Sequence, residues 1–381
     1  MILLKKILEK IIKFKIEIIV FTGYFLYLII IRIITPIFGS GGYINLGEGD
    51  LDWDFYIRMS RDIPSIFKKE IIAPFCHRPL MPFLAGLLPF SLQINYALLV
   101  FISVYLTGIM LYFTLRMFFN KILSVIGLII FCYLNYMILI YQHITLSDYG
   151  FFLIYFHEIY NVDSLALLFI MLCFYCILSG KKKGYLIFLV LGILTKESVI
   201  FTISVFLLYT FLMRDKLENK KVMLYKYFKN LLYIGPGILV YVLIRIIVQP
   251  DSLSNWPRWY VFYGNSEYFS IEMIIRFIKI RYEGFLKRDG LYYWTVGTWG
   301  LSLTILISLN TGKKILNWLK LYGLYMVLVY SQMFLAIATT KFFYYGFFPM
   351  IFLALSGLNS MNEDFTNEST LNLLEGIKLT Q

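Results

Sequence analysis

The chain has 381 residues, of which 60% are hydrophobic and 15% charged, and its formal net charge is +12. Soluble domains contain roughly 45–50% apolar and 25% charged residues, so this composition excludes an ordinary soluble domain. Helices satisfy their own backbone hydrogen bonds in lipid. The composition therefore predicts an all-α, polytopic transmembrane protein.

The positive charge is concentrated in short clusters beside apolar runs, such as Lys181-Lys182-Lys183. Clusters of this kind are typical of cytoplasmic connections in membrane proteins, so topology explains the charge and no nucleic-acid partner is predicted. The N-terminus begins with basic residues and continues into the apolar run 16–38. That run is too long for a cleaved signal peptide, which favours an uncleaved first span.

Apolar segments recur at about the length needed to cross a hydrocarbon layer of about 30 Å. With the Lys-rich connections inside, both termini are cytoplasmic, and the protein is a multi-pass protein of an inner or plasma membrane. Residues 1–358 form a single transmembrane domain and 359–381 a loose cytoplasmic tail. We expect about ten spans, near 16–38, 93–115, 122–142, 163–179, 184–194, 198–213, 231–248, 291–309, 316–338 and 342–358.

The stretch from 184 to 213 needs a break, because a single span there would place the basic run after it on the outer side. Two short segments that meet at Lys196-Glu197 restore the topology. An 11-residue helix rises only about 16 Å, so the turn would lie in a sunken, polar notch. Ionisable side chains in a membrane are commonly functional, and a structural pair formed by Lys196 and Glu197 is the alternative.

Three predicted extracytoplasmic segments are long: 39–92, 143–162 and 249–290. The first ends in the proline-bounded stretch 79–89, which is too short to span and is expected to lie at the interface. The third contains the stretch 270–288, in which isoleucines at helical spacing alternate with basic residues such as Arg276. That pattern predicts a basic interfacial helix.

Acidic residues follow the first predicted span at alternate positions, Asp50, Asp52 and Asp54. Carboxylates there could act as a general base or bind a divalent cation; the alternative is a solvated acidic loop with a helix cap. In a pleated or turned loop, Asp52 and Asp54 would point in similar directions. No cofactor is predicted with certainty, and a divalent cation is possible. Asp50, His157 and Glu158 are the weak metal candidates, since no spacing matches a ligand motif.

Arg78 lies where the first outer segment returns to the membrane, at the expected depth of lipid phosphates. Its guanidinium suits bidentate phosphate binding, with an interface anchor as the alternative. Asp163 opens the fourth predicted span. Its carboxylate is either a site residue or a charge that stabilises a helix N-terminus.

The order of these residues resembles that of the GT-C superfamily of polyprenyl-phosphate-sugar-dependent glycosyltransferases, in the group of bacterial mannosyl- and arabinosyltransferase-like membrane proteins. The resemblance comprises Asp52 with Tyr56 four residues on, Arg78-Pro79-Leu80, Asp163, Leu194 to Glu197, and Lys341 to Pro349. Two positions differ from the family's pattern: Trp53 follows Asp52 where a second acid is common, and Lys341 stands where Arg is common.

The resemblance implies inverting transfer of a sugar from a polyprenyl-phosphate donor to a glycan, lipid or protein acceptor at the extracytoplasmic face, with Asp52 or Asp54 as the base. The donor is already a competent leaving group, so one carboxylate and a cationic cradle would suffice. The alternatives are a membrane transporter, or another lipid-linked transferase or ligase. The implied substrate-binding residues are Tyr56, Arg78, Asp163, Lys196, Glu197, Arg276 and Lys341.

Overall fold

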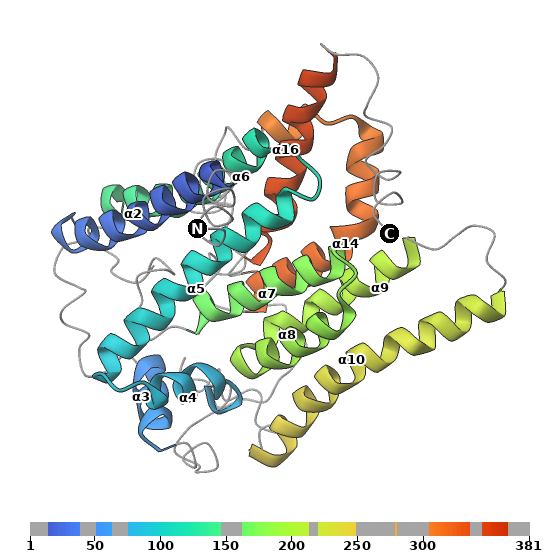
Figure 1. The fold of residues 1–381 in the computed structure, drawn as a ribbon. Coiled ribbons are helices and arrows are strands. Elements are labelled where there is room, and N and C mark those ends of the chain that lie inside the picture. The colour runs from blue at the N-terminus through green and yellow to red at the C-terminus, as the bar shows by residue number, and fades with distance from the viewer. Residues whose placement is uncertain are drawn as a thin grey trace, which may run out of the picture.

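The computed structural model describes residues 14–38, 51–62, 75–145, 162–212, 220–248, 279, 305–335 and 345–364. Throughout these ranges the chain forms helices joined by turns, and no strand occurs in them (Figure 1). The prediction of an all-α protein is therefore confirmed for this part of the chain.

Helix α7 (Asp163–Leu178) lies at the centre of the bundle. It packs against α5 (Leu92–Leu115), α8 (Lys182–Thr195) and α9 (Thr202–Leu212). Almost every side chain of α7 is buried. A helix that is apolar on all sides must be surrounded by other helices, and this is the position that α7 occupies.

A glycine turn joins α7 to α8. Gly180 has φ +69°, a left-handed conformation that a side chain rarely adopts. The Lys181 N–H donates to the Cys176 carbonyl at 2.8 Å, and the Gly180 N–H donates to Ile177 at 3.2 Å. This is the hydrogen-bonded C-terminal cap that ends many helices, and it turns the chain back so that α8 packs against α7.

The predicted break between 194 and 198 is confirmed. Helix α8 ends at Thr195, and the 3-10 helix η3 (Glu197–Phe201) leads into α9. The chain reverses its direction at this break. The end of α9 returns to the level at which α7 ends and α8 begins, where the Tyr209 hydroxyl donates to the Leu178 carbonyl. The Tyr185 and Phe206 rings also stack at 4.5 Å between the start of α8 and the middle of α9.

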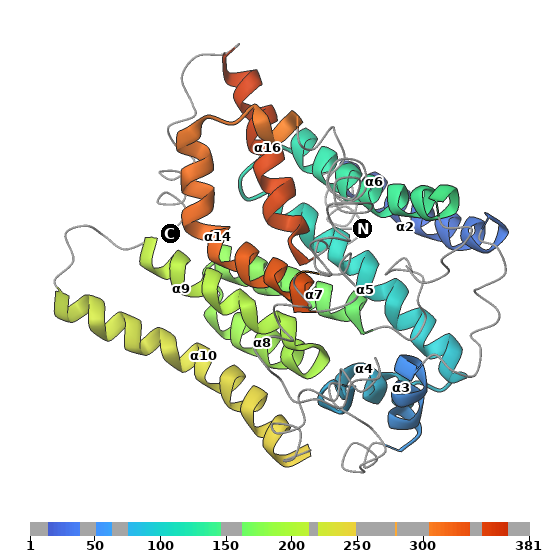
Figure 2. The ribbon, with the colours of Figure 1, turned by 180° about the vertical axis from the view of Figure 1, so that it is seen from behind.

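The remaining long helices surround this centre (Figures 1 and 2). They are α2 (Lys15–Phe38), α6 (Lys121–Thr145), α10 (Lys220–Val248), α14 (Gly312–Leu335) and α16 (Phe347–Asp364). Helix α10 packs along α8, where a Cβ on Gly237 would come within 2.6 Å of Leu189 Cδ2. Helix α16 continues into the segment that the sequence assigned to the tail.

The segment predicted to be the first outer one contains α3 (Leu51–Arg61), the 3-10 helix η2 (Phe75–His77) and α4 (Leu80–Leu87). The loop expected around Asp52 and Asp54 is therefore wrong, because the backbone is helical there. Asn95 of α5 ties α4 in place through hydrogen bonds from its side-chain amide to the carbonyls of Ala85 and Leu88, at 2.8 and 2.9 Å.

Two helical segments in the described ranges are long and apolar enough to cross a membrane, Leu92–Leu115 and Phe228–Val248. The ten-span topology stays a prediction. The shorter apolar helices are Lys121–Tyr133, Asp163–Leu178, Glu197–Leu212 and Phe347–Ser360.

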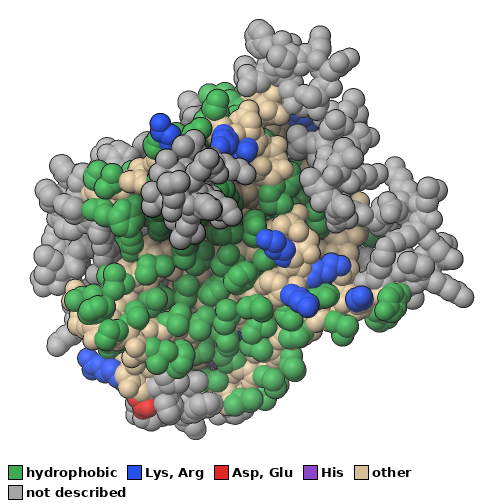
Figure 3. Space-filling model, viewed as in Figure 1, with side chains coloured by type: hydrophobic (Ala, Val, Ile, Leu, Met, Phe, Trp, Pro, Cys, Tyr) green, Lys and Arg blue, Asp and Glu red, His purple; other side chains and the backbone are tan. Residues whose placement is uncertain are grey.

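Figure 3 shows a broad hydrophobic face of the molecule. Most of the Lys and Arg side chains in this view lie above that face and toward the start of α10.

Candidate functional site

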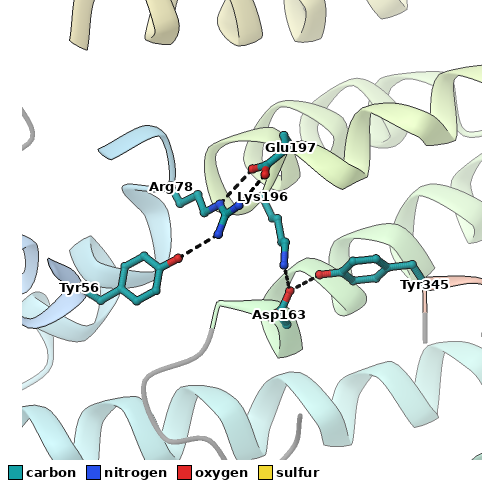
Figure 4. Close-up of polar contacts among 6 residues, drawn as sticks. All are labelled: Tyr56, Arg78, Asp163, Lys196, Glu197 and Tyr345. Carbon is teal, nitrogen blue, oxygen red and sulfur yellow. Dashed lines mark hydrogen bonds and ion pairs between the residues drawn. The ribbon is translucent and has the colours of Figure 1, made fainter. Parts of the chain in front are cut away.

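Polar side chains from five separate elements meet at one end of the bundle, where α7 begins and α8 ends (Figure 4). Five of them were singled out in the sequence as substrate-binding candidates, and the structure brings them together. The cluster consists of Tyr56, Arg78, Asp163, Lys196, Glu197 and Tyr345.

Arg78 binds Glu197 through one edge of its guanidinium. Its Nε donates to Glu197 Oε2 at 2.9 Å, and its Nη2 donates to Oε1 at 2.5 Å. Its Nη1 donates to the hydroxyl of Tyr56 at 3.2 Å, and the guanidinium carbon lies 6.0 Å from the centroid of the Phe75 ring. Arg78 thus joins helix α3 to the break between α8 and α9.

Lys196 and Asp163 form the second ion pair of the cluster. Lys196 Nζ donates to Asp163 Oδ1, and the hydroxyl of Tyr345 donates to the same oxygen. The side chains of Lys196 and Asp163 are only 6% and 5% exposed. Removing one partner from so buried a pair typically costs about 3–5 kcal/mol, because the other charge is left uncompensated.

Helix α3 and η2 hold Tyr56 and Arg78 in place. The hydroxyl of Tyr96 in α5 donates to the Tyr56 carbonyl at 3.2 Å and lies 2.8 Å from Ser60 Oγ. The Phe75 ring packs edge-on against Tyr56, with ring centroids 5.7 Å apart. Arg78 follows η2 directly, so the packing of η2 against α3 sets where the guanidinium lies.

The break between α8 and α9 gives Lys196 and Glu197 different partners. Lys196 is extended, with φ −162° and ψ 139°, and its N–H still donates to the Gly192 carbonyl at 2.8 Å. Successive side chains of an extended backbone point in opposite directions. Lys196 therefore reaches Asp163 while Glu197 reaches Arg78, and the alternative, in which the two residues pair with each other, is wrong.

Asp163 is not only a charge at a helix N-terminus. It is the first residue of α7, where a carboxylate is favourable, but its side chain is also an acceptor for Lys196 and Tyr345. One carboxylate oxygen thus joins α7 to the α8–α9 break and to the segment that precedes α16.

The charges of Arg78 and Glu197 stabilise each other. Burial raises the pKa of Glu197, but the charge and hydrogen bonds of Arg78, together with the charge of Lys196 and a backbone hydrogen bond, outweigh burial and lower that pKa to about 2. Burial opposes the charge of Arg78, whose pKa is nevertheless raised by Glu197 and Tyr56. Both groups are therefore charged at neutral pH. Burial lowers the pKa of the neighbouring His77 to about 4, so that imidazole is neutral.

Other candidates fall outside the part of the chain that the structure describes. Asp50, His157, Glu158, Arg276 and Lys341 lie there, as does the predicted basic interfacial helix apart from Lys279. Within the described ranges no group of three or more His, Cys, Asp or Glu side chains could hold a metal ion. Asp52 and Asp54 belong to α3, but their side chains lie outside the described part.

Tyr345 is the cluster residue that sequence reasoning missed. It is 1% exposed, and its carbonyl accepts a 2.6 Å hydrogen bond from the Tyr325 hydroxyl of α14. The chain contains 31 tyrosines, so residue type alone could not select this one. Its place inside the stretch from Lys341 to Pro349, which carries part of the resemblance, was the available signal.

Chemically, the cluster offers two buried cations in hydrogen-bonding positions, each with a carboxylate and a phenol beside it. Arg78 and Lys196 balance the charges of Glu197 and Asp163. Such a constellation can bind an anion and can hold cations close to a reacting bond.

No family model matches the chain, and no curated protein or solved structure matches it either.

Proposed function

We propose that this protein is an integral membrane glycosyltransferase that moves a sugar from a polyprenyl-phosphate donor to an acceptor hydroxyl. The donor's phosphate lies against Arg78 and Lys196, and Asp52 of α3 is the base. The reaction inverts the anomeric carbon and takes place at the extracytoplasmic face.

The observation that carries this proposal is the hydrogen bond from Arg78 Nη1 to Tyr56, at 3.2 Å. Tyr56 belongs to α3, and Asp52 precedes it by four residues in the same helix. Positions four apart in a helix share a face, whereas positions two apart do not. The register of α3 therefore favours Asp52 over Asp54 as the base nearer to Arg78.

The placement of charge supports an enzyme over a transporter. Lys196 and Glu197 lie at a helix break, and Asp163 is the first residue of α7, so the ionisable groups lie at helix ends rather than midway along helices. The opposite end of the bundle carries the basic residues Lys181 to Lys183, exposed at the start of α8. That distribution agrees with an extracytoplasmic site and cytoplasmic basic connections.

The reaction needs few groups. Asp52 accepts the proton of the acceptor hydroxyl while that oxygen forms a bond to the anomeric carbon. The bond from this carbon to the phosphate oxygen breaks, and its electron pair leaves with the polyprenyl phosphate. Arg78 and Lys196 stabilise the charge that develops on the leaving phosphate.

Purified protein incubated with a panel of polyprenyl-phosphate sugars should release polyprenyl phosphate. Asp52→Asn should lower the turnover by about 10²–10⁴-fold, because asparagine keeps the shape of aspartate but accepts no proton. Asp54→Asn is the matched control and should lose less. Full turnover in Asp52→Asn with none in Asp54→Asn would move the base to Asp54, and full turnover in both would remove α3 from the chemistry.

A further inference from the structure

We propose that Glu197 occupies the phosphate position of Arg78 when no donor is bound, and that the donor phosphate displaces it. The inference rests on the proposed function for the identity of the ligand, a phosphate monoester or diester carried by a lipid. It assigns Glu197 the role of an exchangeable internal anion rather than that of a substrate ligand.

The geometry of the Arg78–Glu197 contact is that of a phosphate contact. The carboxylate accepts two nearly parallel hydrogen bonds, from Nε at 2.9 Å and from Nη2 at 2.5 Å. Two phosphate oxygens can accept from the same pair of donors, because the guanidinium fork fits both groups. One anion therefore excludes the other from this edge of Arg78.

Exposure singles out Glu197 as the group that can leave. Its side chain is 27% exposed, against 9% for Arg78. Lys196 and Asp163 are 6% and 5% exposed. Glu197 can thus exchange its hydrogen bonds with Arg78 for water, whereas Asp163 would have to leave two donors in the interior.

Arg78 keeps its position during this exchange. Its third nitrogen, Nη1, donates to Tyr56, and the guanidinium carbon lies 6.0 Å from the Phe75 ring centroid. These contacts lie on α3 and η2 and do not involve Glu197. Glu197 itself is the first residue of η3, a short 3-10 helix at the break between α8 and α9.

The sign of a mutational effect separates this role from a structural one. If the fork of Arg78 is open to phosphate in only a fraction of molecules, the apparent affinity is the intrinsic affinity multiplied by that fraction. Glu197→Gln removes the competing charge, so it should bind polyprenyl phosphate without a sugar about 10-fold more tightly. Glu17→Gln, which breaks the ion pair of Glu17 with Lys121 outside the cluster, is the matched control and should leave the affinity for polyprenyl phosphate unchanged.

Binding of polyprenyl phosphate, inorganic phosphate and the neutral polyprenol to the full chain in nanodiscs tests the proposal. Glu197→Asp covers the case in which Glu197→Gln does not fold. Its side chain is shorter by one methylene and should not reach both nitrogens of Arg78, so this variant should also bind phosphate more tightly than the native protein. Unchanged or weaker phosphate binding in the folded Glu197 variants would overturn the exchange.

The probes also separate this inference from the proposed function. Tighter binding of inorganic phosphate alone, with polyprenyl phosphate unbound by every variant, would support the exchange and contradict the lipid-linked donor. Turnover of a polyprenyl-phosphate sugar by the native protein, with phosphate affinity unchanged in Glu197→Gln, would support the donor and overturn the exchange.

Discussion

The buried hydroxyl of Tyr345 contributes a hydrogen bond to a charged group in this cluster. Its proton is donated to the Asp163 carboxylate, which Lys196 also contacts. The Tyr325 hydroxyl is equally buried but donates to a neutral backbone carbonyl, that of Tyr345. Hydrogen bonds to charged groups are worth about 1.5–3 kcal/mol, and neutral ones about 0.5–1.5 kcal/mol.

Tyr345→Phe should therefore lower the free energy of unfolding by more than Tyr325→Phe does. Reversible denaturation of the two variants in mixed micelles measures the difference. A larger loss in Tyr325→Phe would mean that Asp163 gains little from the phenol, and that Lys196 alone keeps its charge buried.

At the scale of elements, the close approach of α3 and α4 positions the Arg78–Tyr56 contact. A Cβ on Gly86 of α4 would lie 2.3 Å from the carbonyl oxygen of Ser60 in α3. Because that atom belongs to the backbone, the two helices must separate to accept a side chain. Such overpacking typically costs about 1–3 kcal/mol.

Gly86→Ala should consequently reduce both the free energy of unfolding and donor turnover, since it displaces α3 and with it Tyr56. Gly323→Ala in α14 is the control: its Cβ would meet Leu319 Cδ2 at an ordinary 3.6 Å, and alanine favours a helix by about 1 kcal/mol. Mixed-micelle denaturation and the donor assay provide the readouts. Equal effects of the two substitutions would contradict the close approach as the cause.

Helix α3 also shows why part of the site escaped sequence reasoning. Two of the three alternating acids, Asp52 and Asp54, lie in this helix although the acids favoured a loop, and Phe55, Tyr56 and Met59 are buried at helical spacing. That periodicity was readable but short, and short apolar patterns decide secondary structure poorly. The break at Lys196 was predictable because the basic residues after Met213 leave topology no other solution.

The whole molecule has two chemically different ends, and their orientation can be measured. Two exposed residues mark these ends. Ser91 caps α5 near α4, and Lys183 lies in the first turn of α8 at the opposite end. In a cysteine-free version of the protein, Ser91→Cys should react with an impermeant reagent added to intact cells. Lys183→Cys should react only after the cells are permeabilised. The reverse labelling pattern would invert the topology and place the cluster in the cytoplasm.

The sequence by itself determined the helical class, the segments that became α5 to α9, the part of α10 from residue 231 on, and five of the cluster residues. Composition and hydrophobic length act locally along the chain, and so do the basic clusters, so no partner needs to be known. Only the tertiary structure decided which charge binds which. Arg78 and Glu197 are 119 residues apart, Lys196 and Asp163 are 33 apart, and Tyr345 and Asp163 are 182 apart. Pairing over such distances depends on how helices pack, and a buried tyrosine becomes a site residue only when packing places its hydroxyl beside a carboxylate.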